Sequence, residues 1–340
     1  MSDDPAPPPL RPPPAGYLVR RPTWDDLRAV AALHAEVSRR RIGAVTVREA
    51  DLRMRWLGLD SFEDALLVET DGPAAALVAY AAFEADLDPW TDDLELHLDS
   101  TEHPDHTGRG IGRFLLGRAE DRALLAARRH GRDHAVLRTA VIDGDDTARA
   151  FFTCRGFVAV RHLLELRLDL HAAPPAPVWP KGVRCRTFRP GHDEVAAWRT
   201  HQAAFADVPT YLPLDLDEWL ETRVRRDPAF DPELLLLAEH DGEPVGLAVC
   251  RAGTEVAAED GWVRDLGVIP GWRRHGVGMA LLRAAFAAFR ARGLTGVALE
   301  VDDVTVEGAV ALYRRAGMRI VRRTDVMERE VRVGASAPSR

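Results

Sequence analysis

Cysteine is scarce in this chain of 340 residues, which contains only Cys154, Cys185 and Cys250. Because these residues are odd in number and widely spaced, they exclude a disulfide framework and a metal site built on cysteine. Sparse cysteine of this kind is typical of a reducing compartment. We therefore expect three small, buried or half-buried thiols in a cytoplasmic protein.

Positive charge is also in short supply, since 45 lysine and arginine residues stand against 53 aspartate and glutamate residues, a formal net charge of −8. No global basic field is present that would recruit nucleic acid or an anionic membrane surface. No apolar run reaches the roughly 18 residues that a membrane-spanning helix needs. We therefore expect neither a nucleic acid nor a membrane as partner.

The beginning of the chain, MSDDPAPPPLRPPPAG, has no apolar segment of the kind found in signal peptides. Its density of proline predicts a disordered or polyproline II tail over residues 1–16. The remainder, with 46% hydrophobic and 29% charged residues, is typical of a globular protein long enough for two domains.

One stretch carries a recognisable pattern for binding an anion. An apolar run that includes Leu266 and Val268 ends at Pro270, and Gly276 and Gly278 then open a helix with apolar periodicity. The first turn of a helix has unpaired N–H groups and the positive end of the helix dipole, which together attract phosphate. Glycine lets the anion approach the backbone. The stretch therefore predicts a phosphate cradle.

The same order of elements occurs twice. Pro104 and Pro270 are 166 residues apart, and so are Gly110 and Gly276. The proline-rich segment HAAPPAPVWPKG separates the two copies. This predicts a tail over residues 1–16, a domain over 17–170, a linker over 171–182, a second domain over 183–332 and a tail over 333–340.

At the second glycine turn the sequence resembles the GNAT superfamily of N-acetyltransferases. The family's Arg/Gln-x-x-Gly-x-Gly/Ala signature is matched by residues 273–278, RRHGVG. Residues 311–318, ALYRRAGM, resemble the family's Ala-x-x-Leu-Tyr-x-x-x-Gly-Phe. The duplication is similar in layout to the tandem acetyltransferases of the mycothiol synthase type.

This resemblance implies an α/β fold of two tandem GNAT domains, each with a mostly antiparallel mixed sheet flanked by helices. Two central strands would separate to admit the pantetheine arm of acetyl-CoA, and the acetyl group would pass directly to an amine without a metal. The implied cofactor-binding residues are Leu266, Gly267, Val268, Arg273, Arg274, His275, Gly276, Val277, Gly278 and Met279, with Arg109, Gly110, Ile111 and Gly112 in the first copy.

The side chains of Arg273 and Arg274 are suited to the pyrophosphate and the 3′-phosphate, whereas His275 is expected to contribute its backbone. The histidines near the first motif (His97, His103 and His106) lack metal-ligand spacing.

The two copies differ where the resemblance places the chemistry. Tyr313 matches the tyrosine that commonly serves as general acid toward the departing thiolate, and its counterpart Phe152 has no proton to donate. The first motif also begins with Thr107 instead of arginine or glutamine. We therefore expect a catalytic second copy and a degenerate first copy. The second copy departs from the family too, at Val306, where the family often has asparagine.

A general base is expected on or just before the strand that leads to the glycine turn. Asp265 and Glu259 are the preferred candidates, as base or as an anion that holds the amine. The alternatives are Asp260 and, on the next strand, Glu300; Asp265 could instead form an ion pair with a neighbouring arginine.

Three functions remain open for the whole chain. The leading hypothesis is an acetyl-CoA-dependent acetyltransferase acting on a primary amine of a small molecule, as a monomer or homodimer. A larger amine, such as a cysteinyl-glycoside of the mycothiol type or an aminoglycoside, is the second, and a non-catalytic CoA-binding or scaffold protein is the third. Acidic residues around the second helical stretch of the second copy (Asp215, Asp217, Glu218 and Glu221) are compatible with a cationic acceptor or with a solvated helix face.

Overall fold

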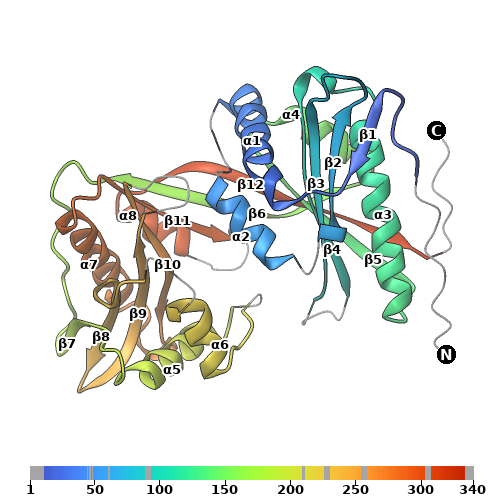
Figure 1. Ribbon diagram of the computed structural model, residues 1–340. Coiled ribbons are helices and arrows are strands. Elements are labelled where there is room, and N and C mark those ends of the chain that lie inside the picture. Colours follow the sequence, from blue (N-terminus) through green and yellow to red (C-terminus); the bar gives the residue numbers. More distant parts are fainter. Residues whose placement is uncertain are drawn as a thin grey trace. The chain divides into compact units, whose positions relative to one another are not determined.

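The computed structural model describes residues 11–43, 45, 47, 49–59, 62–88, 93–208, 211–225, 230–253, 259–302 and 308–333. The chain forms two compact units (Figure 1). The first comprises the residues up to Arg161 together with those from Thr324 onward, and the second comprises His162–Arg323. Among the described residues, no helix is long and apolar enough to cross a membrane.

In the first unit, six strands form a sheet with helices on both faces. The strand order is β1 (Tyr17–Arg20), β2 (Ala65–Thr70), β3 (Leu77–Leu87), β4 (Leu94–Glu102), β5 (His134–Ile142) and the end of β12 (Arg319–Arg332). All neighbours are antiparallel except β4 and β5. The helices are α1 (Leu27–Ile42), α2 (Glu49–Gly58), α3 (Ile111–Arg129) and α4 (Asp146–Thr153).

The second unit repeats this plan. Its strand order is β6 (Val158–Asp169), β11 (Gly296–Asp302), β10 (Asp260–Val268), β9 (Glu243–Ala252), β8 (Leu235–His240) and β7 (Val183–Thr187). The helices are α5 (Glu194–Phe205), α6 (Leu216–Leu220), α7 (Val277–Ala291) and α8 (Ala309–Arg315), with one π turn over Glu221–Arg225. Side chains along each strand alternate between the two faces of the sheet. One hydrophobic cluster includes residues of α5 and α6, and another includes residues of α7 and α8.

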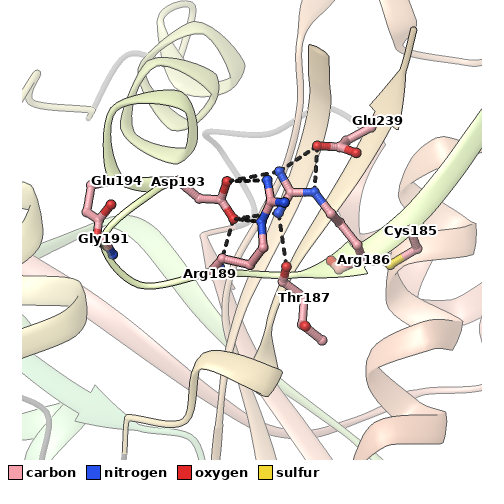
Figure 2. Close-up of polar contacts among 8 residues, drawn as sticks. All are labelled: Cys185, Arg186, Thr187, Arg189, Gly191, Asp193, Glu194 and Glu239. Carbon is pink, nitrogen blue, oxygen red and sulfur yellow. Dashed lines mark hydrogen bonds and ion pairs between the residues drawn. The ribbon is translucent and has the colours of Figure 1, made fainter. Parts of the chain in front are cut away.

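The start of α5 is held by a buried ionic network (Figure 2). Arg186 on β7 donates to Glu239 at 2.7 Å and to Asp193, the N-cap of α5, at 2.5 Å. The first unit has the same network, because Arg20 donates both to Asp26 and to Glu69. The matching arginines are 166 residues apart. Both networks tie the first long helix of each unit to the outer strands.

The last strand of each copy belongs to the other unit, which the sequence did not predict. Residues 163–169 of β6 pair with β11, and residues 324–332 of β12 pair with β5. Figure 1 shows β6 (green) beside β11 and β12 (red) beside β5. The boundaries expected at residues 170 and 183 therefore do not coincide with those of the compact units. In the exchanged arrangement the edges of β5 and β11 are both paired and are not open sheet edges.

Ion pairing reinforces this exchange in the second unit. Arg167 on β6 contacts both carboxylate oxygens of Asp260 on β10, at 2.6 and 2.9 Å. Asp260 is 3% exposed, so removal of Arg167 would leave a buried carboxylate without this ion pair.

We predict that a fragment spanning residues 162–323 is more stable than one spanning 183–332, by about 3 kcal/mol, because the latter leaves Asp260 buried without Arg167 and exposes the edge of β11. Urea unfolding followed by circular dichroism measures the difference. Equal stability of the two fragments would contradict the exchanged arrangement.

Candidate active site

The central strands of the second unit separate beside the glycine turn. β10 and β11 pair in parallel only at residues 260–262 and 296–298, although both strands continue. On its other side β10 pairs with β9 as far as Val268, with a bulge between Val263 and Asp265. One backbone edge of β10, including Leu266, Gly267 and Val268, is therefore not paired with β11. The register confirms the strand separation that the resemblance implies.

The glycine turn forms an open cradle at the start of α7. Gly276 is the N-cap, with φ of 91°, and a Cβ placed on it would meet no atom within 4 Å. A Cβ on Gly278 would meet Leu312 at 3.5 Å and Val268 at 3.7 Å, in ordinary contact. The first-turn amides of α7, which follow in Val277 to Met279, thus lie at an uncrowded surface. The residues fit a pyrophosphate group.

Arg273, beside this cradle, has protein partners. Its guanidinium donates to Asp207 at 2.5 and 2.8 Å and to the carbonyls of Ala204 and Val268 at 3.0 and 3.1 Å. Arg273 therefore ties the glycine turn to the end of α5. The sequence could not reveal Asp207 as its partner, since 66 residues separate the two.

Arg274 and His275 occupy the exposed part of the turn. Arg274 has φ of 65°, a left-handed conformation that is costly for any residue with a Cβ, and its counterpart is Gly108 with φ of 82°. Nδ1 of the His275 ring lies 2.8 Å from the Arg273 carbonyl, and the ring also lies edge-on to Trp272 with the centroids 6.1 Å apart. Arg274 makes no ion pair with any described residue and is the guanidinium available to a phosphate.

Tyr313 lies on α8 with only 9% of its surface exposed. Burial, together with the negative charge of Asp265, raises the pKa of its phenol to about 12. The phenol therefore keeps its proton at all ordinary pH values, as a proton donor must. Val306, the departure from the family pattern, lies outside the described residues.

Asp265 forms an ion pair rather than standing as a free base. Its Oδ2 accepts from Nε of Arg223 at 2.8 Å, and Nε2 of His201 lies 3.6 Å away. Burial raises the pKa of this carboxyl, but His201 and Arg223 outweigh it and hold the value at about 2. Such a group is a poor proton acceptor near neutral pH. The ion pair that the sequence left as the alternative is the one found.

Behind Asp265, the polar contacts continue through α5. His201 is 1% exposed, and its Nδ1 lies 3.1 Å from the Tyr211 hydroxyl, which in turn donates to Gln202. Asp265, opposite Val249 on β9, faces the same side of the sheet as these residues. No local sequence motif indicates that His201, Tyr211 and Arg223 lie around Asp265.

A signal for two of them was present in the duplication. His34 and His201 are 167 residues apart, and Arg55 and Arg223 are 168 apart. In the first unit, Arg55 donates to Asp99 at 2.7 Å, and His34 is buried within their electrostatic reach. Asp99 and Asp265 are 166 apart. Each copy thus contains one arginine, one aspartate and one buried histidine in matching places.

Glu259 and Asp260 lie at the start of β10, away from the glycine turn. Glu259 is exposed and precedes β10, nine residues from Val268, or roughly 30 Å along an extended strand. This places it at the far end of β10 from the glycine turn. The carboxylate of Asp260 forms an ion pair with Arg167. Neither position is consistent with a base beside the opening.

Glu300 lies on β11 where β10 and β11 have separated. Its neighbours Leu299 and Val301 belong to the cluster that contains Tyr313, so strand alternation turns Glu300 to the face of Asp265. Its side chain reaches solvent. Partial desolvation and the charges of Glu165 and Asp302 raise the pKa of Glu300 against the opposing effect of Arg322.

The acidic residues around α6 have local structural partners. Asp215 is the N-cap of α6 and accepts from the Glu218 amide at 2.8 Å, and Glu218 reciprocates at 3.1 Å. Asp217 and Glu221 lie near Arg225. Of the two readings left open by the sequence, the capping contacts favour a solvated helix end.

In the first copy, Gly110 is the N-cap of α3 with φ of 92°, followed by Ile111 and Gly112. Arg109 precedes this turn. Phe152, the counterpart of Tyr313, packs between Phe151 and Phe157 with ring centroids 5.1 Å apart on each side. No hydroxyl is present at this place.

Two of the three cysteines are buried or half-buried as expected, and one is exposed. Cys250 is buried and Cys185 is half-buried, with a pKa that burial raises to about 11, but Cys154 is exposed. In the part of the chain that the structure describes, no three His, Cys, Asp or Glu side chains gather as a metal site would require.

Comparisons with known proteins agree on one family. The model of the Acetyltransferase (GNAT) family matches residues 196–318. A protein named mycothiol acetyltransferase from Thermobispora bispora is 34% identical over 303 residues, covering 87% of this chain and 94% of that protein. A protein of the same name from Streptomyces coelicolor is 35% identical over 271 residues, 78% of this chain and 79% of that one.

Solved structures show the same architecture. The GCN5-related N-acetyltransferase from Sphaerobacter thermophilus superposes with a TM-score of 0.79 at 29% identity, covering 96% of this chain and 99% of that chain. A tandem GNAT protein from the clavulanic acid biosynthesis pathway has a TM-score of 0.65 at 19% identity, with 92% and 98% covered, which is a likeness of fold.

We predict that Asp265→Asn costs about 2 kcal/mol of stability at neutral pH, given a folded pKa of about 2 against about 3.9 when unfolded. Because the folded pKa is the lower one, the ionised carboxylate stabilises the fold above pH 4, and this stability is lost as the pH falls toward 2. Urea unfolding of wild type and variant across this range measures the difference.

Asp99→Asn serves as the matched control. The side chains of Arg55 and Asp99 are 51% and 37% exposed, compared with 17% and 14% for Arg223 and Asp265, so we expect a smaller cost. A cost for Asp265→Asn that stays constant from pH 7 to pH 2 would contradict the ion-pair assignment.

Proposed function

Because the chain belongs to the GNAT family of acetyltransferases, we propose that its second unit transfers the acetyl group of acetyl-CoA directly to a primary amine of a small molecule. The observation that carries this proposal is the coincidence of three features in one unit: an open glycine cradle, a separated strand pair and a buried, protonated Tyr313. Acetyl-CoA supplies the activated thioester.

Binding is assigned to the backbone of this unit. The unpaired edge of β10 at Leu266–Val268 offers hydrogen-bonding groups to the pantetheine arm, and the amides of Gly276–Met279 receive the pyrophosphate. Arg274 adds a guanidinium for a phosphate, and His275 adds its backbone. Arg273 acts indirectly, by fixing the turn against α5.

Tyr313 is assigned as general acid. Its phenol is not hydrogen-bonded to any described residue, and its raised pKa keeps it protonated. The phenol can therefore direct its proton at the departing thiolate of CoA, and a donor positioned in this way lowers the cost of the negative charge that develops on sulfur.

Glu300 is assigned as general base, either directly or through a water molecule. The raised pKa of Glu300 is closer to the pKa of an amine than the pKa of an ordinary carboxyl group is, which favours proton transfer from the amine. The side chain also lies on the same face of the sheet as Asp265. Asp265 is assigned as a positioning residue: its charge, held by Arg223, helps to keep Tyr313 protonated and presents a negative field to a cationic amine.

For the acceptor, we propose an amine of a cysteinyl-glycoside, the class suggested by the relatives named mycothiol acetyltransferase. One of these relatives aligns over 94% of its length, so the likeness is not limited to the cofactor half. Beside the buried His201, the half-buried side chains of Tyr211 and Gln202 offer hydrogen bonds to a hydroxylated substrate.

We predict that Tyr313→Phe lowers kcat by a factor of about 10² to 10⁴, the usual contribution of a general acid, and leaves acetyl-CoA affinity unchanged. Release of CoA thiol with an amine acceptor measures turnover, and calorimetry measures binding. Phe152→Tyr in the first unit is the control and is expected to leave turnover unchanged. An unaltered kcat in Tyr313→Phe would remove Tyr313 from the role of general acid, whereas absence of CoA thiol release by wild type would support the non-catalytic alternative.

We predict that Glu300→Gln removes the acidic limb of the pH profile of kcat/KM, whereas Glu259→Gln retains the wild-type profile because of its distance along β10. The profile is measured with saturating acetyl-CoA between pH 5 and pH 9. Loss of the acidic limb in Glu259→Gln alone would return the role of base to that residue.

A further inference from the structure

The two glycine cradles differ at the residue that ends the inner strand. Val268 ends β10 and Glu102 ends β4, and these positions are 166 residues apart. The methyl group Cγ2 of Val268 lies 3.7 Å from a Cβ placed on Gly278. In the first unit, the carboxylate oxygen Oε2 of Glu102 lies 3.0 Å from a Cβ placed on Gly112. A carboxylate therefore stands where the second unit has a methyl group.

This carboxylate interacts with the start of α3. Burial raises the pKa of Glu102, while Arg41 and the backbone amide of Gly112 oppose the rise by favouring the ionised form. Its second oxygen, Oε1, is buried and has no hydrogen-bond partner among the described residues. Gly112 belongs to the first turn of α3, whose open amides and positive dipole end would otherwise favour a phosphate.

Two further groups of the chain crowd the same turn. A Cβ on Gly112 would meet the ring of Phe151 at 3.1 Å, where the matching contact of Gly278 is Leu312 at 3.5 Å. Outside, the Pro14 ring lies 3.6 Å from the Cβ position of Gly110, whereas Gly276 has no atom within 4 Å. The first cradle is therefore covered on both sides.

The segment that carries Pro14 is held on α3 by charge. Nε of Arg11 donates to Asp121 at 3.1 Å, and another of its nitrogens lies 3.4 Å from Glu120. Tyr17, at the end of the same segment, donates its amide to the Pro14 carbonyl at 3.2 Å. Residues expected from sequence to form a disordered tail thus include, over 11–16, a segment packed on the helix.

We propose that the chain's own Glu102 and Pro14 close the first cradle, so that the protein binds a single CoA per chain, in the second unit. The inference rests on the proposed function for the second cradle, while the closure of the first is independent of it. An entering pyrophosphate would meet the like charge of Glu102 at close range and would have to displace the segment that carries Pro14.

The test is the number of CoA molecules bound per chain, measured by isothermal titration calorimetry with coenzyme A. Wild type is expected to bind one. Val268→Glu, which copies the first cradle into the second, is expected to bind at least 100-fold more weakly, and Val268→Gln separates the effect of charge from that of size. Glu102→Val combined with deletion of residues 1–14 is expected to bind two. Circular dichroism confirms that each variant is folded.

Two molecules bound by wild type would overturn the proposal, and so would one molecule bound by the folded, opened variant. Absence of binding in wild type with one molecule bound by the opened variant would uphold the closure and reject the proposed function of the second unit. Absence of binding in both would reject both inferences. Unchanged affinity in Val268→Glu would show that a carboxylate at this position does not exclude CoA.

Discussion

The parallel pairing of β10 with β11 stops after three residues, and the rest of the site depends on this interruption. Up to Trp262 the two strands share backbone hydrogen bonds; from Val263 onward β10 is paired only with β9. An interior backbone edge without a partner is costly unless another group satisfies it. In this unit the edge of β10 that is not paired with β11 runs to the residues before the glycine turn at Gly276. Tyr313 is buried within electrostatic reach of Asp265 on this strand.

Comparison of the two copies separates groups that serve the fold from groups that serve chemistry. The buried histidine, its aspartate and the arginine occur in both copies, including the one with Phe152 in place of Tyr313. Because the first copy has these three residues without a tyrosine at position 152, they have a structural role that does not require the phenol. This supports a positioning role for Asp265. By contrast, the first copy has Phe152 in place of Tyr313 and Glu102 in place of Val268, so the two copies differ at the positions to which the proposed chemistry and the proposed CoA binding are assigned.

Sequence patterns were sufficient to predict the helices, strands and glycine turns. They were not sufficient to predict which side chains pair across the fold. The glycine turns, the duplication and the helix that carries Tyr313 follow from local periodicity and spacing, because each depends on residues close in sequence. The pairing of Arg273 with Asp207, and of Asp265 with Arg223, joins residues 66 and 42 positions apart. A sequence shows that such charges exist but not which of them meet.

The sequence by itself determined the family, the two cradles and the inequality of Tyr313 and Phe152, since these are matters of residue identity and spacing. Only the tertiary structure decided that β6 and β12 are exchanged, that Asp265 pairs with Arg223, that Glu300 lies on the same face of the sheet as Asp265 and that Glu102 lies close to Gly112. The physical reason is the same in each case: a strand edge, a buried charge or a helix end takes the partner that folding brings to it, and that partner is distant in the chain.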